Sequence, residues 1–208
     1  MIYDDSPYFD RSLPVDVSQG AFLPHWHQDG KMQFVSFRLA DSLPRGRRLE
    51  LERFAKLFEQ RHPRPWDQKI QWEYNRHINN TTERLLNAGY GSCLLRHSEV
   101  RQIVADTIMY GDGTNYMVEA FVIMPNHVHI LLCLSDTCSL DEVMGRIRQF
   151  SSRKVNQITG ATGNLWMPDY FDRIIRTPNH LAYCLDYIDR NPRHLPQSHY
   201  TLYHRPRQ

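Results

Sequence analysis

The chain has 208 residues, of which 41% are hydrophobic and 23% are charged. This composition supplies a core for one globular domain and excludes a chain that is disordered as a whole. No apolar run approaches the ~20 residues of a membrane helix, and the acidic N-terminus lacks the apolar segment of a secretory signal. We therefore expect a cytoplasmic protein with no membrane partner. The net charge of +2 does not by itself indicate a nucleic-acid-binding protein.

Alternating strand and helix patterns run along most of the chain. Residues 1–30 form an arm whose prolines and glycines predict irregular structure. The apolar periodicity then predicts these elements: a strand over 32–39, helices over 46–60 and 67–87, a helix over 98–109, strands over 116–124 and 127–134, a helix over 139–158, an extended segment over 166–175 and a helix over 178–190. The two central strands are tightly joined, which predicts an antiparallel hairpin.

These elements predict an α+β fold, in which helices pack on one antiparallel sheet. The main domain is expected over residues 31–195, with a helical insertion at about 46–87. The arm over 1–30 precedes this domain and a tail over 196–208 follows it. The insertion is the region whose role the sequence does not indicate.

Two histidines occupy the start of the second central strand, in the run His127-Val128-His129. Residues two apart on a strand point to the same side, so the two imidazoles lie side by side. Such a pair is suited to binding a divalent metal ion, and the alternative is a pair of histidines on a solvent-facing strand. A second His-x-His run, His25-Trp26-His27, lies in the arm, where we expect ligand contact, or surface packing of Trp26, rather than metal binding.

The last helix carries Tyr187 and Asn191, which are four residues apart and therefore share one helical face. Aromatic stripes on helices usually belong to the core, but here an amide lies in register with the phenol just before Pro192. Together with His127 and His129, these residues predict one site for phosphodiester chemistry. In it, the histidines and the Asn191 amide oxygen bind Mg²⁺ or Mn²⁺, and Tyr187 attacks phosphorus.

The run from Phe121 to Leu132, FVIMPNHVHILL, resembles the signature of single-tyrosine HUH transposases. Three further blocks resemble the branch of REP-associated tyrosine transposases: LPHWH at 23–27 followed by FVSFRLADSLP at 34–44, LWMPDYFDR at 165–173, and DYIDRNP at 186–192. These blocks span nearly the whole chain in order. The helix after the histidine pair departs from the family in carrying Arg148 where a lysine is frequent, and the insertion at 46–87 is longer than in the simplest members.

The resemblance implies an RRM-like, ferredoxin-type sheet and an enzyme of DNA transposition and recombination. It implies that Tyr187 is the nucleophile of a 5′-phosphotyrosine intermediate, and that His127, His129 and Asn191 are the metal ligands. The implied partner is single-stranded DNA that carries a REP-like palindromic hairpin. The sequence leaves open whether the protein is a monomer or a homodimer, and whether it is mobile or domesticated.

Basic residues interleaved with aromatics suit phosphate contact combined with base stacking. The predicted DNA-binding residues are His25, Trp26, His27, Arg146, Arg148, Arg153, Lys154, Arg173 and Arg176. Two other functions stay open: an RRM-like nucleic-acid-binding regulator that is catalytically silent, and a metal-dependent hydrolase that uses water as nucleophile. The complete set of four catalytic residues argues against the first, and the lack of an acidic cluster near the histidines argues against the second.

Overall fold

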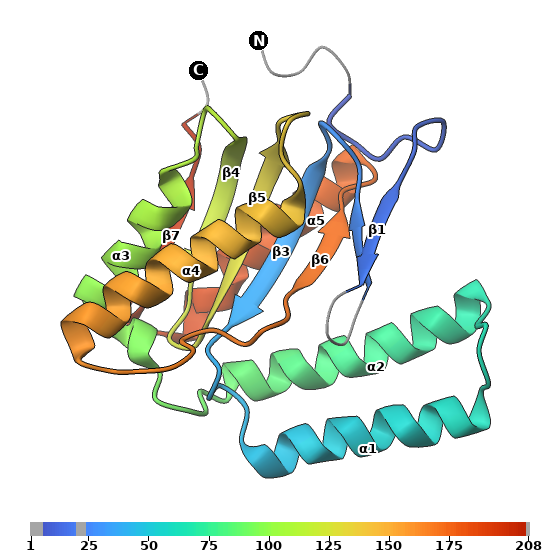
Figure 1. Cartoon of the computed structure of the whole chain (residues 1–208), viewed down its shortest axis with the longest axis horizontal. Coiled ribbons are helices and arrows are strands. Elements are labelled where there is room, and N and C mark those ends of the chain that lie inside the picture. The colour runs from blue at the N-terminus through green and yellow to red at the C-terminus, as the bar shows by residue number, and fades with distance from the viewer. Residues whose placement is uncertain (1–5, 20–23, 207–208) are drawn as a thin grey trace. The chain divides into compact units, whose positions relative to one another are not determined.

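The computed structural model describes residues 6–19 and 24–206 (Figure 1). The chain divides into two compact units. One unit comprises residues 1–40 and 94–208 and contains the sheet. The other comprises residues 41–93 and consists of two helices and their flanking turns. None of the described helices is long and apolar enough to cross a membrane.

A five-stranded antiparallel sheet organises the first unit, with the strand order β6-β3-β5-β4-β7. Its strands are β3 (Met32–Arg38), β4 (Tyr116–Ile123), β5 (His127–Leu134), β6 (Phe171–Ile174) and β7 (Thr201–His204). Within this unit, the helix α3 (Ser98–Met109) lies between β3 and β4 along the chain, and α4 (Leu140–Thr159) lies between β5 and β6. This β-α-β-β-α-β sequence with its strand order is the ferredoxin-like arrangement, which confirms the predicted fold class.

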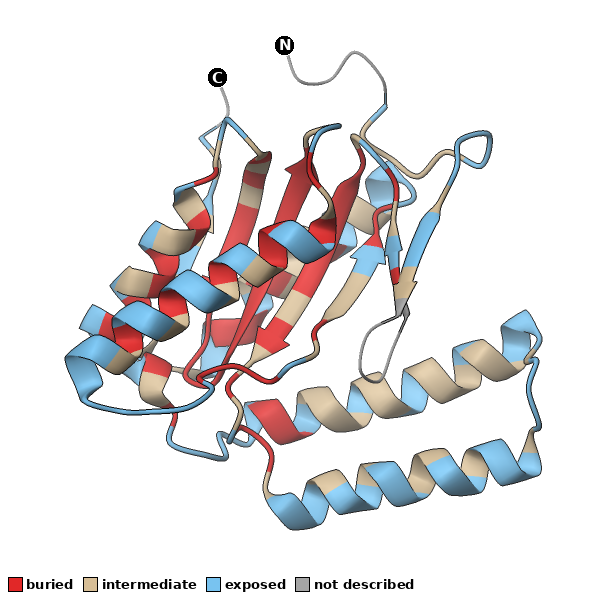
Figure 2. Cartoon of the chain, viewed as in Figure 1, coloured by how far each residue is buried: buried red, intermediate tan, exposed pale blue. Residues whose placement is uncertain are grey.

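One face of the sheet is covered by α3 and α4 (Figure 1). Period-2 alternation sends Val35 and Phe37 of β3, and Val128 and Ile130 of β5, into this layer, where they pack with Met144 of α4. The strands β3, β4 and β5 and the inner sides of both helices are mostly buried, as Figure 2 shows. Ser139 and Glu142 form a capping box at the start of α4.

The opposite face of the sheet is covered by α5 (Pro178–Arg190). Its Cys184 and Ile188 pack on Phe34 and Leu131, which lie on the other side of the strands from Val35 and Ile130. Thr177 caps the helix by accepting a hydrogen bond from the backbone N–H of His180 at 3.1 Å, and Pro178 starts it. Three short 3₁₀ turns are Leu94–Arg96, Asn191–His194 and Gln197–His199.

Both ends of the chain contain strands that periodicity did not indicate. Within the arm, β1 (Asp16–Gln19) pairs with β2 (Pro24–His27), so the prediction of a wholly irregular arm is wrong. Within the predicted tail, β7 pairs with β4. Each of these strands has only four residues, too few for alternation to be visible in the sequence.

The second unit holds α1 (Arg45–Arg61) and α2 (Gln68–Asn87), close to the helices predicted over 46–60 and 67–87. The Asp67 side chain caps α2 by accepting from the backbone N–H of Ile70 at 2.8 Å. Leu43, Leu85 and Leu86 form a small core at one end of the two helices. Aromatic side chains fill the interface between the helices further along, with Phe58 and Tyr74 at 5.4 Å between ring centroids.

Candidate active site

The two histidines of β5 lie on the sheet face that α5 covers. His127 and His129 are almost fully buried, with 1% and 0% of their surface exposed, and their ring centroids are 4.8 Å apart. The structure thus brings the imidazoles together as their i, i+2 spacing predicts. Burial lowers the pKa of His129 to about 3, so this ring is neutral at pH 7 and its ring nitrogen can act as a ligand.

Hydrogen bonds on Nδ1 orient both rings. His127 donates from Nδ1 to the amide oxygen of Asn126 at 2.7 Å. The Nδ1 of His129 lies 2.6 Å from the hydroxyl of Ser36, which is its direct cross-strand partner on β3. Because an amide oxygen only accepts, His127 keeps a lone pair on Nε2. When Nδ1 of neutral His129 carries the proton, its Nε2 also keeps a lone pair, as metal-binding histidines require.

The helix α5 brings Tyr187 to the histidine pair. Its hydroxyl lies 3.4 Å from Nε2 of His129, and its ring meets that imidazole edge-on, with centroids 5.0 Å apart. Phe34 of β3 contacts both rings, at 5.6 Å from His129 and 5.7 Å from Tyr187 between centroids. The phenol is therefore held between the core and the histidines, with its oxygen on the histidine side.

Asn191 follows directly after α5 and continues its helical geometry. Its backbone N–H donates to the carbonyl of Tyr187, so the two residues lie one turn apart, as predicted. Its side-chain oxygen Oδ1 is buried and makes no hydrogen bond within the described part of the chain. A buried amide oxygen without a partner is costly, and a bound cation would remove that cost.

The donor set fits a divalent cation. Two imidazole Nε2 atoms and one amide oxygen would supply neutral ligands, leaving the cation's charge available to a phosphate. Among residues 6–19 and 24–206, no group of three or more His, Cys, Asp or Glu side chains forms another candidate metal site. The second His-x-His run, which lies in β2, is therefore not part of a competing metal-binding cluster among these residues.

The predicted DNA-binding residues separate into groups with different surroundings. Arg146, Arg153 and Lys154 are exposed on α4, which covers the sheet face opposite the histidines. Arg173 of β6 is exposed and pairs in register with Phe34, so it lies on the same face as the histidines. Arg176 is exposed just before α5.

Arg148 of α4 differs from its neighbours. Its guanidinium donates to the carbonyls of Met144, Met167 and Pro168 and lies over the ring of Tyr170, 5.2 Å from the centroid. Three backbone acceptors thus occupy the side chain that we predicted to bind phosphate. Its evident role is to hold the segment after α4 against that helix.

His25 is a second correction to the predicted DNA contacts, because it is 5% exposed and both ring nitrogens are occupied. Nδ1 lies 2.5 Å from Asp172 and Nε2 lies 2.9 Å from Asp169, while the ring stacks on Tyr170 at 3.9 Å. Burial alone would lower the pKa of His25, but the two carboxylates outweigh it and raise this pKa to about 9. His25 thus binds the β1–β2 hairpin to β6 as an imidazolium.

Two other side chains of β1 and β2 are exposed and available for ligand contact. Trp26 is 51% exposed, and its register partner Val17 is 49% exposed. The backbone N–H of Trp26 donates to Asp172 at 3.1 Å, so the same carboxylate that binds His25 also anchors this residue. His27 points elsewhere, with Nε2 2.8 Å from Asp29.

Sequence reasoning missed the side chains that support the site. Ser36 orients His129, Asn126 orients His127, and Arg38 is the cross-strand partner of His127. One signal was present in the sequence: Ser36 and Arg38 are polar residues that alternate with Val35 and Phe37 on a strand. Their register against β5 was not visible.

One family model matches the segment that carries His127, His129, Tyr187 and Asn191. Residues 95–191 match the family model of IS200-like transposases, from the 3₁₀ turn before α3 to Asn191. A search of curated proteins gives no match. Among solved structures, a REP-associated tyrosine transposase bound to a REP hairpin is 14% identical, with a TM-score of 0.43, covering 81% of this chain and 70% of that one. A Deinococcus radiodurans protein described as a transposase is 14% identical, with a TM-score of 0.36, covering 84% and 97%.

Proposed function

We propose that this chain nicks and rejoins single-stranded DNA through a 5′-phosphotyrosine intermediate on Tyr187, in keeping with the match of residues 95–191 to the family model of IS200-like transposases. The observation that carries the proposal is the 3.4 Å approach of the Tyr187 hydroxyl to Nε2 of His129 at a buried histidine pair. This arrangement places a nucleophile beside ligands for a cation that binds phosphate.

The reaction balances as a transesterification. The Tyr187 hydroxyl loses its proton, its oxygen forms a bond to phosphorus, and the bond from phosphorus to the 3′ oxygen breaks. The departing oxygen takes up a proton and becomes a free 3′-hydroxyl, while the 5′ phosphate stays on the tyrosine. Rejoining is the reverse attack by a 3′-hydroxyl, so no water or nucleotide cofactor is consumed.

His127, His129 and Asn191 would hold Mg²⁺ or Mn²⁺. A bound cation of this kind would supply Lewis-acid stabilisation of the charge that builds on the phosphoryl oxygens. The protein's own contribution is positional: Ser36 and Asn126 orient the imidazoles, and Phe34 packs against both the tyrosine and His129. A preorganised site of this type loses little free energy to reorientation during the reaction.

We propose a substrate with a palindromic hairpin and a single-stranded flank, in keeping with the sequence resemblance. One tyrosine per chain forms one covalent link, which requires one strand at the site. Trp26 on the β1–β2 hairpin offers an exposed ring for stacking an unpaired base, and Arg173 offers a cation on the face of the histidines. These side chains suit a splayed strand better than a closed duplex.

Covalent trapping tests the proposal. The chain is incubated with a 5′- or 3′-labelled hairpin oligonucleotide and Mg²⁺ or Mn²⁺, and the products are separated on a denaturing gel. We expect a protein–DNA adduct with the fragment 3′ of the cut, which Tyr187→Phe abolishes while DNA binding persists. Binding without any adduct from the native chain would instead support the catalytically silent regulator.

Tyr183 provides the matched control, since it is a phenol one turn earlier on α5 and is 64% exposed. Tyr183→Phe should leave adduct formation unchanged. An adduct that survives Tyr187→Phe and disappears in Tyr183→Phe would move the nucleophile to Tyr183.

A further inference from the structure

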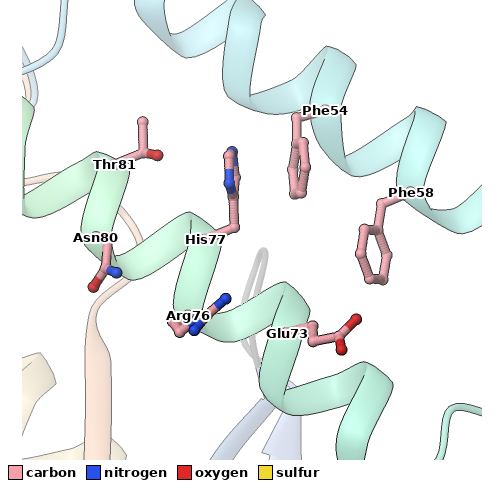
Figure 3. A pocket seen from close by; sticks show the side chains of 7 residues that line it. All are labelled: Phe54, Phe58, Glu73, Arg76, His77, Asn80 and Thr81. Carbon is pink, nitrogen blue, oxygen red and sulfur yellow. The ribbon is translucent and has the colours of Figure 1, made fainter.

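The unit formed by residues 41–93 has an open groove between its two helices, with a volume of about 390 Å³ (Figure 3). Phe54 and Phe58 line it from α1, and Arg76, His77, Asn80 and Thr81 line it from α2. Small-molecule sites typically begin at about 300 Å³, so the groove has room for a group the size of a nucleobase. Nothing in the proposed strand-transfer chemistry uses it.

Flat rings form the wall of the groove. His77 stacks on Phe54 with centroids 3.8 Å apart and planes at 21°, and Phe58 lies 5.6 Å from Phe54. The two phenylalanines are half-buried and His77 is exposed, so ring surface faces the open space. Such a wall favours a planar, uncharged ligand that can stack.

Polar groups of several kinds border the same rings. Asn80 and Thr81 offer both donors and acceptors, and Glu73 adds a carboxylate acceptor. These are the group types that bind the edge of a base, including its exocyclic amine. Arg76 adds a cation at the border, and its guanidinium lies 4.4 Å from the centroid of Trp72, which is 57% exposed.

The excess of basic over acidic residues lies in this unit. Residues 41–93 hold ten Lys and Arg against seven Asp and Glu, whereas the remainder of the chain holds 15 against 16. Exposed Arg45, Arg53 and Lys56 lie on one side of α1, at spacings of eight and three residues. A polyanion is therefore attracted to the helical unit more than to the rest of the chain.

We propose that this groove binds an unpaired nucleobase of a single-stranded DNA segment, while the surrounding basic side chains contact the adjoining phosphates. Stacking surface, base-edge donors and acceptors, and excess positive charge are the three elements by which proteins bind single strands with little sequence preference. The choice of DNA rests on the proposed function. The helical unit then gives the chain a DNA contact separate from the histidine–tyrosine site.

The test measures the base-dependent part of binding. Tyr187→Phe protein without added metal, which binds without cutting, is titrated with a fluorescent oligothymidine and with the same strand made abasic. Removing the bases should weaken binding by about tenfold, because the stacking contact between a base and the groove is lost. His77→Ala should reduce this preference for the normal strand several-fold and leave the affinity for the abasic strand unchanged.

His62→Ala is the matched control, because the His62 ring also contacts a groove phenylalanine, with its centroid 4.6 Å from that of Phe58, but does not line the groove. The His62→Ala variant should keep the native preference for the normal strand over the abasic strand. Circular dichroism melts establish that both variants are folded. The proposal would be overturned if His77→Ala kept the native preference for the normal strand over the abasic strand. It would also be overturned if His62→Ala lost as much of that preference as His77→Ala.

A second measurement locates the base directly. A photoreactive thymine analogue in the strand should crosslink to the peptide containing Arg76, His77 and Asn80. Crosslinks confined to residues outside 41–93 would also overturn the proposal. The titration and the crosslinking do not depend on adduct formation by the native chain. This inference can therefore be refuted while the proposed strand-transfer function stands, and the reverse is also possible.

Discussion

Substitution of His25 by glutamine should loosen the β1–β2 hairpin from the sheet in a pH-dependent way. His25 is the only described residue of β2 whose side chain contacts both Asp169 and Asp172, and the Asp172 side chain is 2% exposed. Around this imidazolium lie two further charged groups: Asp141, which accepts from the Tyr170 hydroxyl, and Arg148, which lies over that ring. Glutamine keeps polarity but removes the positive charge.

The magnitude follows from the pKa of His25, which rises from its ordinary 6.5 to about 9. A shift of this size stabilises the docked hairpin by at most about 3 kcal/mol. Burial raises the pKa of Asp172 despite its contact with His25, which offsets part of that gain, so we expect about 2 kcal/mol. Because the pKa is raised, the stabilisation is complete below pH 6.5 and is lost as pH rises through about 9.

Hydrogen exchange measured by mass spectrometry provides the assay. At pH 6.5, peptides covering residues 24–28 should exchange about 30-fold faster in His25→Gln than in the native chain, after correction for intrinsic rates. The difference should shrink at pH 9 and above. His27→Gln, on the same strand, should behave like the native chain. This reasoning would be refuted if residues 24–28 were protected from exchange equally in His25→Gln and in the native chain at pH 6.5. It would also be refuted if their protection in the native chain stayed constant as the pH rose through 9.

Three further predictions concern the site and its DNA contacts. His129→Ala should abolish metal-dependent cleavage, and Asn191→Ala should be milder because water can replace a neutral ligand; native rates for His129→Ala across a Mg²⁺ titration would contradict the metal assignment. Ser36→Ala should slow cleavage about 10- to 100-fold with little change in melting temperature, and Ser36→Thr should restore it, whereas a native rate in the alanine variant would show that this hydroxyl does not orient the ring. Arg173→Gln should lower the salt dependence of DNA binding by about one phosphate contact. Arg148→Gln should lower the melting temperature and leave the salt dependence unchanged. The reverse pattern would show that Arg148 contacts phosphate and that Arg173 supports the fold.

Local spacing was enough to predict the central elements of the site. The i, i+2 rule for a strand places His127 beside His129, and the i, i+4 rule for a helix places Tyr187 one turn from Asn191. Both rules depend only on neighbouring residues, so no tertiary information is needed. That α5 would bring the tyrosine to these histidines was inferred from the residue types, an amide in register with a phenol and a pair of histidines, and from the family resemblance, not from periodicity.

Contacts that depend on register or on distant pairing could not be predicted in this way. Ser36 meets His129 only because β3 and β5 pair in one particular register, and a shift by one residue would turn Ser36 to the other face. His25 meets Asp172 across 147 residues of sequence. The motif around His25 therefore suggested ligand binding, whereas its position in the fold makes it part of the hairpin's attachment.

Under the proposed function, the separation of the basic residues onto two sheet faces constrains the path of a DNA strand on the protein. A strand that contacts both Arg153 on α4 and Tyr187 on α5 must pass around an edge of the sheet. At the β7 edge, His204 contacts Asp189 and Arg205 is paired with Asp112, so both side chains already have acidic partners. At the β6 edge, the exposed Arg173 and the nearby β1–β2 hairpin with exposed Trp26 offer a cation and a stacking surface. The β6 edge is therefore the favoured path, and the His25 contacts that hold the hairpin there should matter for DNA binding as well as for stability.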